Sequence, residues 1–98
     1  MVLKLEKDFF EMIKLVASTF ALKGNIWLFL DEELISKGNT VREVELEEGK
    51  SYVLHWLMKG EIGDTFSISV SSPKEAQYLL TTVVGRSKKE FGGFKFST

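Results

Sequence analysis

The sequence predicts a mainly β fold in which antiparallel strands pack as a β-sandwich. Three observations favour this fold. Apolar and polar residues alternate over several short segments, glycines separate these segments at intervals of roughly ten residues, and Pro73 is the only proline. The chain has 98 residues, of which 44% are hydrophobic, so it is long enough to bury one core. We therefore expect a single domain over residues 1–98.

The N-terminal segments allow two interpretations. Residues 2–6, VLKLE, are a candidate edge strand. Residues 9–22 fit an amphipathic helix, because Asp8 and Glu11 form a capping-box pattern and apolar residues then recur on one helix side. The same residues also fit a strand if the surrounding β-structure overrides their helix propensity. The alternative fold is therefore α+β, with helix 9–22 packed on an antiparallel sheet.

Four segments form the body of the predicted sheets. Residues 24–31 and 51–58 are apolar on both faces, which indicates central strands. Residues 41–47 and 64–71 alternate between apolar and polar side chains, which indicates strands with one buried face. The inward-facing side chains of the last three segments are the predicted core: Val44, Leu46, Tyr52, Leu54, Trp56, Phe66, Ile68 and Val70.

Loop parity predicts how three of these strands pair. A register shift of one residue turns every side chain to the other face, so burial selects the loop length. A three-residue loop after 41–47 and a five-residue loop from Lys59 to Gly63 keep the apolar side chains on one face. Strand 51–58 is then expected between strands 41–47 and 64–71.

The C-terminal third contains a helix start and two further strands. Ser72, Pro73 and Glu75 form a helix-start pattern, but the β-branched residues that follow limit it to a short helical turn near 73–78. Residues 79–84 and 93–97 are predicted to form a terminal hairpin. About seven strands in a hundred residues is typical of an immunoglobulin-like sandwich, which we use here as an architectural analogy only.

Composition argues against several kinds of chemistry. The 13 basic and 14 acidic residues are mixed along the chain, so no basic field is present to bind nucleic acid. One histidine and no cysteine make a zinc site improbable, and the glycines do not follow a phosphate-binding spacing. No segment has the length of a membrane span. We therefore expect no metal, no cofactor, no nucleic acid and no membrane span.

His55 is the only histidine and the one candidate catalytic side chain. The predicted strand pairing places it on the outer face, near Glu43 or Val41. Catalysis needs a nucleophile or a substrate site beside the histidine, and no nucleophile motif accompanies it. A small hydrolase that uses His55 and a carboxylate, Glu43 or Glu45, is therefore the least supported alternative, and the sequence predicts a protein that is not an enzyme.

Trp27 and Phe29 lie on the face of segment 24–31 opposite its aliphatic residues. If this face is exposed, it is the best candidate for a ligand or partner contact, and His55 is the third candidate contact residue. A ladder of hydroxyl groups in segment 64–71 suits an exposed sheet face or a flat edge that another strand joins.

These observations predict a non-catalytic binding or assembly module that acts through a sheet face or an edge strand. The expected partner is another protein or a neighbouring domain, and residues 2–6 and 93–97 are the candidate edges. The alternative is a carbohydrate-binding accessory domain. That alternative depends on Trp27 as a stacking platform and on the hydroxyl ladder: Thr65, Ser67, Ser69 and Ser71.

Overall fold

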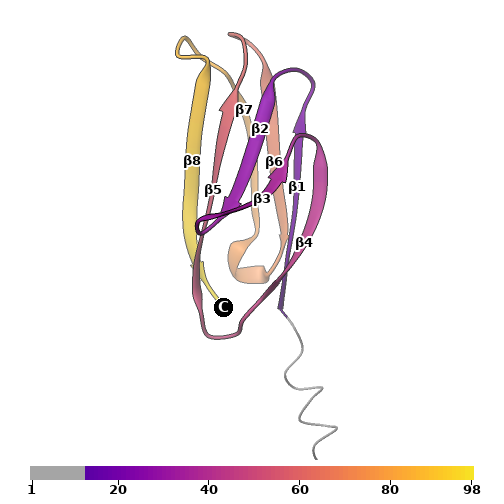
Figure 1. The fold of residues 1–98 in the computed structure, drawn as a ribbon, viewed down its shortest axis with the longest axis vertical. Coiled ribbons are helices and arrows are strands. Elements are labelled where there is room, and N and C mark those ends of the chain that lie inside the picture. The colour runs from indigo at the N-terminus through magenta and orange to yellow at the C-terminus, as the bar shows by residue number, and fades with distance from the viewer. Residues whose placement is uncertain (1–12) are drawn as a thin grey trace, which may run out of the picture.

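The computed structural model describes residues 13–98, which fold as two packed antiparallel sheets (Figure 1). The first sheet has the strand order β4-β1-β6-β7, and the second sheet has the order β3-β2-β5-β8. The strands of the first sheet are β1 (Ile13–Ala21), β4 (Thr40–Leu46), β6 (Thr65–Ser72) and β7 (Tyr78–Val83). The strands of the second sheet are β2 (Asn25–Leu30), β3 (Glu33–Lys37), β5 (Ser51–Lys59) and β8 (Lys89–Ser97). The predicted mainly β sandwich is confirmed, with eight strands among the described residues instead of about seven.

The core lies where alternate side chains from the two sheets meet. Leu54 and Met58 of β5 and Phe66 and Ile68 of β6 are fully buried. Successive side chains of a strand point to opposite faces, so each of these strands buries one set and exposes the other. The inward faces predicted for these strands are confirmed. Burial of this set drives folding, because each buried methylene contributes about 0.8 kcal/mol.

Residues 13–21 form strand β1 instead of the helix of the alternative prediction. β1 pairs with β4 on one side and with β6 on the other. Its buried residues Leu15, Ala17 and Thr19 follow a period of two. Backbone pairing on both sides thus overrides the helical spacing of the apolar residues. The α+β alternative is wrong for this segment, and the candidate edge at 2–6 lies outside the described residues.

The predicted pairing of strand 51–58 with 41–47 and 64–71 is wrong. β4 pairs with β1, whereas β5 lies between β2 and β8, and β6 lies between β1 and β7. The pairing predicted from loop lengths assumes that consecutive strands share a sheet. Both connections instead cross from one sheet to the other, so Trp56 and Phe66 enter the core from opposite sheets.

The predicted terminal hairpin is also wrong. β7 pairs with β6 in the first sheet, and β8 pairs with β5 in the second. The last two strands of an immunoglobulin-like sandwich are neighbours in one sheet, so that topology is not confirmed. The expected short helical turn is confirmed as the 3-10 helix η1 (Lys74–Ala76), which connects β6 to β7.

A network of side-chain hydrogen bonds stabilises the connection from β3 to β4, which crosses from the second sheet to the first. The Thr19 hydroxyl of β1 donates to the Gly38 carbonyl at 2.5 Å and lies 3.5 Å from the Ser36 hydroxyl of β3. The Asn39 side chain accepts the Ala21 N–H at 2.6 Å and donates to the Ala21 carbonyl at 3.1 Å. These side chains satisfy polar groups that the crossing would otherwise leave without partners.

Both ends of the described chain leave the sandwich at the same end (Figure 1). Ile13, the first residue of β1, pairs with Leu46 of β4. Ser97, the last residue of β8, pairs with Ser51 of β5. Residues 47–50 connect Leu46 directly to Ser51, so the two chain ends flank one connection.

Gly92 is required by the indole ring of Trp56. The two residues pair across β5 and β8, and a Cβ atom at Gly92 would lie only 2.5 Å from Trp56 Cζ2. The ring cannot move freely, because it is 5% exposed and packs against Tyr78 and Phe94. We expect Gly92→Ala to lower the free energy of unfolding by about 1–3 kcal/mol in urea denaturation.

The matched control is Gly85→Ala, because a Cβ atom at Gly85 meets no atom within 4 Å. We expect this variant to change the free energy of unfolding by less than about 0.5 kcal/mol. Equal destabilisation by the two alanines would contradict the assigned contact.

Candidate functional site

The outer face of the second sheet brings together the three residues that the sequence singled out. Trp27 and Phe29 both lie on β2 and point away from the core, as the alternation predicts. His55 of β5 pairs directly with Phe29. All three side chains are half-buried, so each keeps part of its ring accessible.

Two rows of side chains cross this outer face. Strand pairing places Leu57 and then Phe91 beside Trp27, and it places Leu34 and His55 on either side of Phe29. Phe91 is 73% exposed and Leu34 is 48% exposed. We define this surface as the aromatic face: Trp27, Phe29, Leu34, His55, Leu57 and Phe91.

His55 has a structural role within the aromatic face. Its ring stacks on Phe29 with a centroid separation of 5.1 Å and an interplanar angle of 11°. Its Nε2–H donates to the Asp31 carbonyl at 2.6 Å, in the turn between β2 and β3. The same turn is fastened to Val53, whose N–H donates to Asp31 Oδ1 at 2.8 Å. The imidazole therefore holds a turn against β5.

The predicted neighbours of His55 are elsewhere. Val41, Glu43 and Glu45 belong to β4, which is an edge strand of the first sheet, and all three are exposed. The expectation that His55 lies near Glu43 or Val41 is therefore wrong, because β4 pairs with β1 and not with β5. Glu43 forms an ion pair with Lys14 at 3.8 Å. Within residues 13–98, no group of three or more histidine, aspartate or glutamate side chains is arranged to hold a metal ion.

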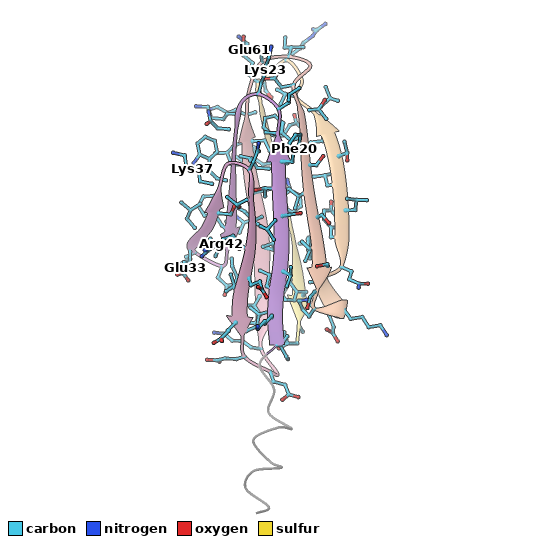
Figure 2. The ribbon with its side chains drawn as sticks, turned by 90° about the vertical axis from the view of Figure 1, so that its right-hand side faces the viewer. Phe20, Lys23, Glu33, Lys37, Arg42 and Glu61 are labelled. Carbon is cyan, nitrogen blue, oxygen red and sulfur yellow. The ribbon has the colours of Figure 1, made fainter. Side chains whose placement is uncertain are left out.

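Lysines surround the aromatic face. Four lysines occupy outward-facing positions of the second sheet: Lys37, Lys59, Lys89 and Lys95. The Lys37 ammonium lies 5.9 Å from the centroid of the Trp27 ring, and Figure 2 shows Lys37 projecting away from the sandwich. No aspartate or glutamate has an outward-facing position in the four described strands of this sheet. Lysines therefore rim the strands around the apolar centre, whereas the β2–β3 turn beside His55 carries the exposed carboxylates of Asp31, Glu32 and Glu33.

Sequence reasoning missed Leu34, Leu57, Phe91 and the lysine rim. Leu57 alternates with the buried Trp56 and Met58, so its outward orientation was readable. The assembly of the missed residues into one surface was not readable, because it depends on β8 and β3 flanking β5 and β2.

The hydroxyl ladder lies on the opposite side of the molecule from Trp27. Its residues, Thr65, Ser67, Ser69 and Ser71, belong to β6 in the first sheet. Trp27 belongs to β2 in the second sheet. The two features on which the carbohydrate alternative depends therefore do not form one site.

Two open hollows at the ends of the sandwich are charged. One, of about 800 Å³, lies among the loops that contain Lys23, Glu61 and Lys88, and Glu61 is 3.7 Å from the Lys88 ammonium. The other, of about 520 Å³, is lined by five carboxylates and one lysine together with three apolar or aromatic residues. Neither hollow combines an apolar cavity with converging polar groups, which is the usual form of a small-molecule site.

Comparisons with protein-family models, with curated proteins and with solved structures found no match. Within residues 13–98, no helix is long and apolar enough to cross a membrane. The fold by itself defines the class of protein, which is a small β-sandwich domain.

The stack between Phe29 and His55 is expected to contribute measurable coupling. Aromatic pairs contribute about 0.5–1.5 kcal/mol beyond their buried area. We expect a double-mutant cycle of Phe29→Ala and His55→Ala to show a coupling in this range in urea denaturation. As a control, Phe29→Ala combined with Leu79→Ala on the first sheet should be additive to within about 0.5 kcal/mol. A Phe29–His55 coupling no larger than that of the control pair would contradict the stack.

Proposed function

We propose that this domain is a non-catalytic binding or assembly module that contacts a protein partner through the aromatic face. The proposal depends chiefly on one observation, which is that two adjacent rows of apolar and aromatic side chains, each across three strands, together span the second sheet. Contiguous apolar patches are uncommon on soluble proteins and are typical of interaction surfaces. Aromatic residues are also enriched at such interfaces, where they supply much of the binding energy.

The lysine rim specifies the chemistry of the partner. A partner surface with an apolar centre and acidic side chains around it would complement the aromatic face in both hydrophobicity and charge. The four lysines would increase the rate of association with such a surface, and salt would weaken that effect. We therefore propose an acidic-rimmed protein surface as the partner.

The surroundings of His55 support a non-catalytic role. Nε2 donates to the Asp31 carbonyl and Phe29 covers one face of the ring, so only Nδ1 is left as a base. General-base catalysis also needs a group from which that nitrogen takes the proton. Glu43 and Glu45, the carboxylates proposed for a hydrolase, lie in the first sheet.

Carbohydrate binding is the second candidate, and the partial exposure of Trp27 favours it. Lys37 lies over the Trp27 ring, so a sugar that stacks there would have to displace the lysine side chain. Tryptophan fluorescence titrated with polysaccharides tests this candidate, because the only other tryptophan, Trp56, is buried. A saturable change that disappears in Trp27→Phe would favour carbohydrate over a protein partner.

Site-specific photo-crosslinking tests the protein partner. A photo-reactive phenylalanine analogue is placed at position 91, on the aromatic face, or at position 20, which carries an exposed phenylalanine on the first sheet. We expect one protein to be captured in the native host cells from position 91 and not from position 20. Equal capture from both positions, or none from position 91, would contradict the proposal.

The captured protein is then purified, and its affinity is measured by calorimetry. We expect Phe91→Ser to weaken binding by about tenfold or more, because an exposed aromatic residue that becomes buried in an interface commonly contributes about 1.4 kcal/mol or more. Lys37→Glu with Lys95→Glu should slow association and reduce its salt dependence. Unchanged affinity in Phe91→Ser would exclude the aromatic face as the contact surface.

A further inference from the structure

The edge of the first sheet at β7 carries no charge. Proteins usually protect an edge strand with charged residues, proline or a bulge. Of the four edge strands that the structure describes, β3, β4 and β8 each contain charged side chains, whereas β7 contains none. The uncharged run extends from Ala76 to Gly85. β7 is therefore the edge that is least protected against pairing with another strand.

Within residues 13–98 no strand pairs with the outer edge of β7, so its backbone presents hydrogen-bonding groups there at alternate residues. Beyond the end of β7, the Val84 N–H donates to the Asp64 carbonyl at 2.9 Å, and the Val84 carbonyl accepts the Gly63 N–H at 3.0 Å. The even-numbered residues of β7 therefore direct their N–H and C=O groups toward β6. The odd-numbered residues Leu79, Thr81 and Val83 direct theirs toward the open edge.

The space between the edges of the two sheets is lined by apolar and aromatic groups. A groove of about 280 Å³ lies between β7 and β8, and Trp56, Tyr78 and Leu80 form part of its wall. The Trp56 and Tyr78 rings are 5.6 Å apart at their centroids. A strand added beside β7 would place alternate side chains over this groove.

We propose that β7 pairs with β7 of a second copy of this chain, antiparallel and around a two-fold axis through Thr81. This register places Leu79 of each copy opposite Val83 of the other, and it places the two Thr81 side chains opposite each other. The free backbone groups of all three residues are then paired. The first sheet continues across the axis, and of the aromatic face only Phe91, which lines the groove beside β7, lies near the interface.

The chemistry of β7 specifies a second copy as the occupant. Leu79 and Val83 are 75% and 57% exposed on the outer face, and each is an apolar match for the other. Threonine pairs directly opposite each other are favourable in antiparallel sheets. Because β7 has no charge, two copies do not repel at this edge, and a two-fold interface uses the same patch on both subunits.

Disulfide trapping tests the register, because the chain contains no cysteine. In the paired register, the two Cα atoms at position 81 are about 5.5 Å apart, which a disulfide spans. We expect Thr81→Cys to form a covalent dimer on mild oxidation. Leu79→Cys alone and Val83→Cys alone should form no covalent dimer, because their equivalent Cα atoms are about 13 Å apart along the strands. A mixture of these two variants should cross-link.

Solution mass tests the pairing itself. We expect light scattering to show a species of twice the 11.1 kDa chain mass that dissociates on dilution. Thr81→Lys places two like charges opposite each other on the axis and should return the mass to that of one chain. Thr65→Lys is the matched control, because Thr65 is exposed on the central strand β6, and it should leave the dimer intact. Circular dichroism confirms that both variants are folded.

The outcomes separate this inference from the proposed function. A single-chain mass up to about 1 mM, or a dimer that survives Thr81→Lys, would overturn β7 pairing. Cross-linking through Leu79→Cys alone and not through Thr81→Cys would overturn the register. Leu34→Lys changes the aromatic face on β3, the edge strand opposite β8, and should leave the dimer unchanged, so failure of the aromatic face would not alter this result. Loss of the dimer in Leu34→Lys would show that the second sheet forms the interface instead.

Discussion

The rest of the structure depends on the burial of one side of every strand between the two sheets. Leu54, Met58, Phe66 and Ile68 fill the interior, and none of them retains contact with water. Because side chains alternate along a strand, this requirement also determines which residues face outward. The core therefore positions the aromatic face, even though no residue of that face is in the core.

Much of the fold was predictable from local pattern, but the strand partners were not. The alternation of apolar and polar residues identified the inward-facing side chains of β5 and β6, because burial of one face of a strand follows its two-residue period. It could not identify which strand lies beside which, since consecutive strands may share a sheet or cross to the other one. Trp27 and Phe29 were thus placed on an outer face, whereas the addition of Leu57 and Phe91 required the observed pairing of β5 with β2 and β8. The helical spacing of apolar residues in 13–21 favoured a helix that does not form, because backbone pairing on both sides of β1 outweighs local propensity.

The sandwich keeps its two candidate contact surfaces apart. The aromatic face is on the outer face of the second sheet, whereas the β7 edge lies in the plane of the first sheet. One surface offers apolar side chains within a basic rim, and the other offers unpaired backbone groups. Side chains provide selectivity and backbone pairing provides a geometrically fixed attachment, so the two surfaces are suited to different tasks. Apart from Phe91, which lines the groove beside β7, recognition of a partner and association of copies therefore use different residues of this fold.

The position of the two chain ends has a mechanical consequence. Ile13 and Ser97 flank the same connection, so a force that pulls them apart acts across the strands and not along them. Among the described strands, β8 is an edge strand that pairs with β5 alone, and its last residue is the one under load. Its hydrogen bonds would break one after another, as in an opening zipper, instead of resisting together in shear. Under tension the sandwich would yield first at its C-terminal strand, and the rupture force would be low.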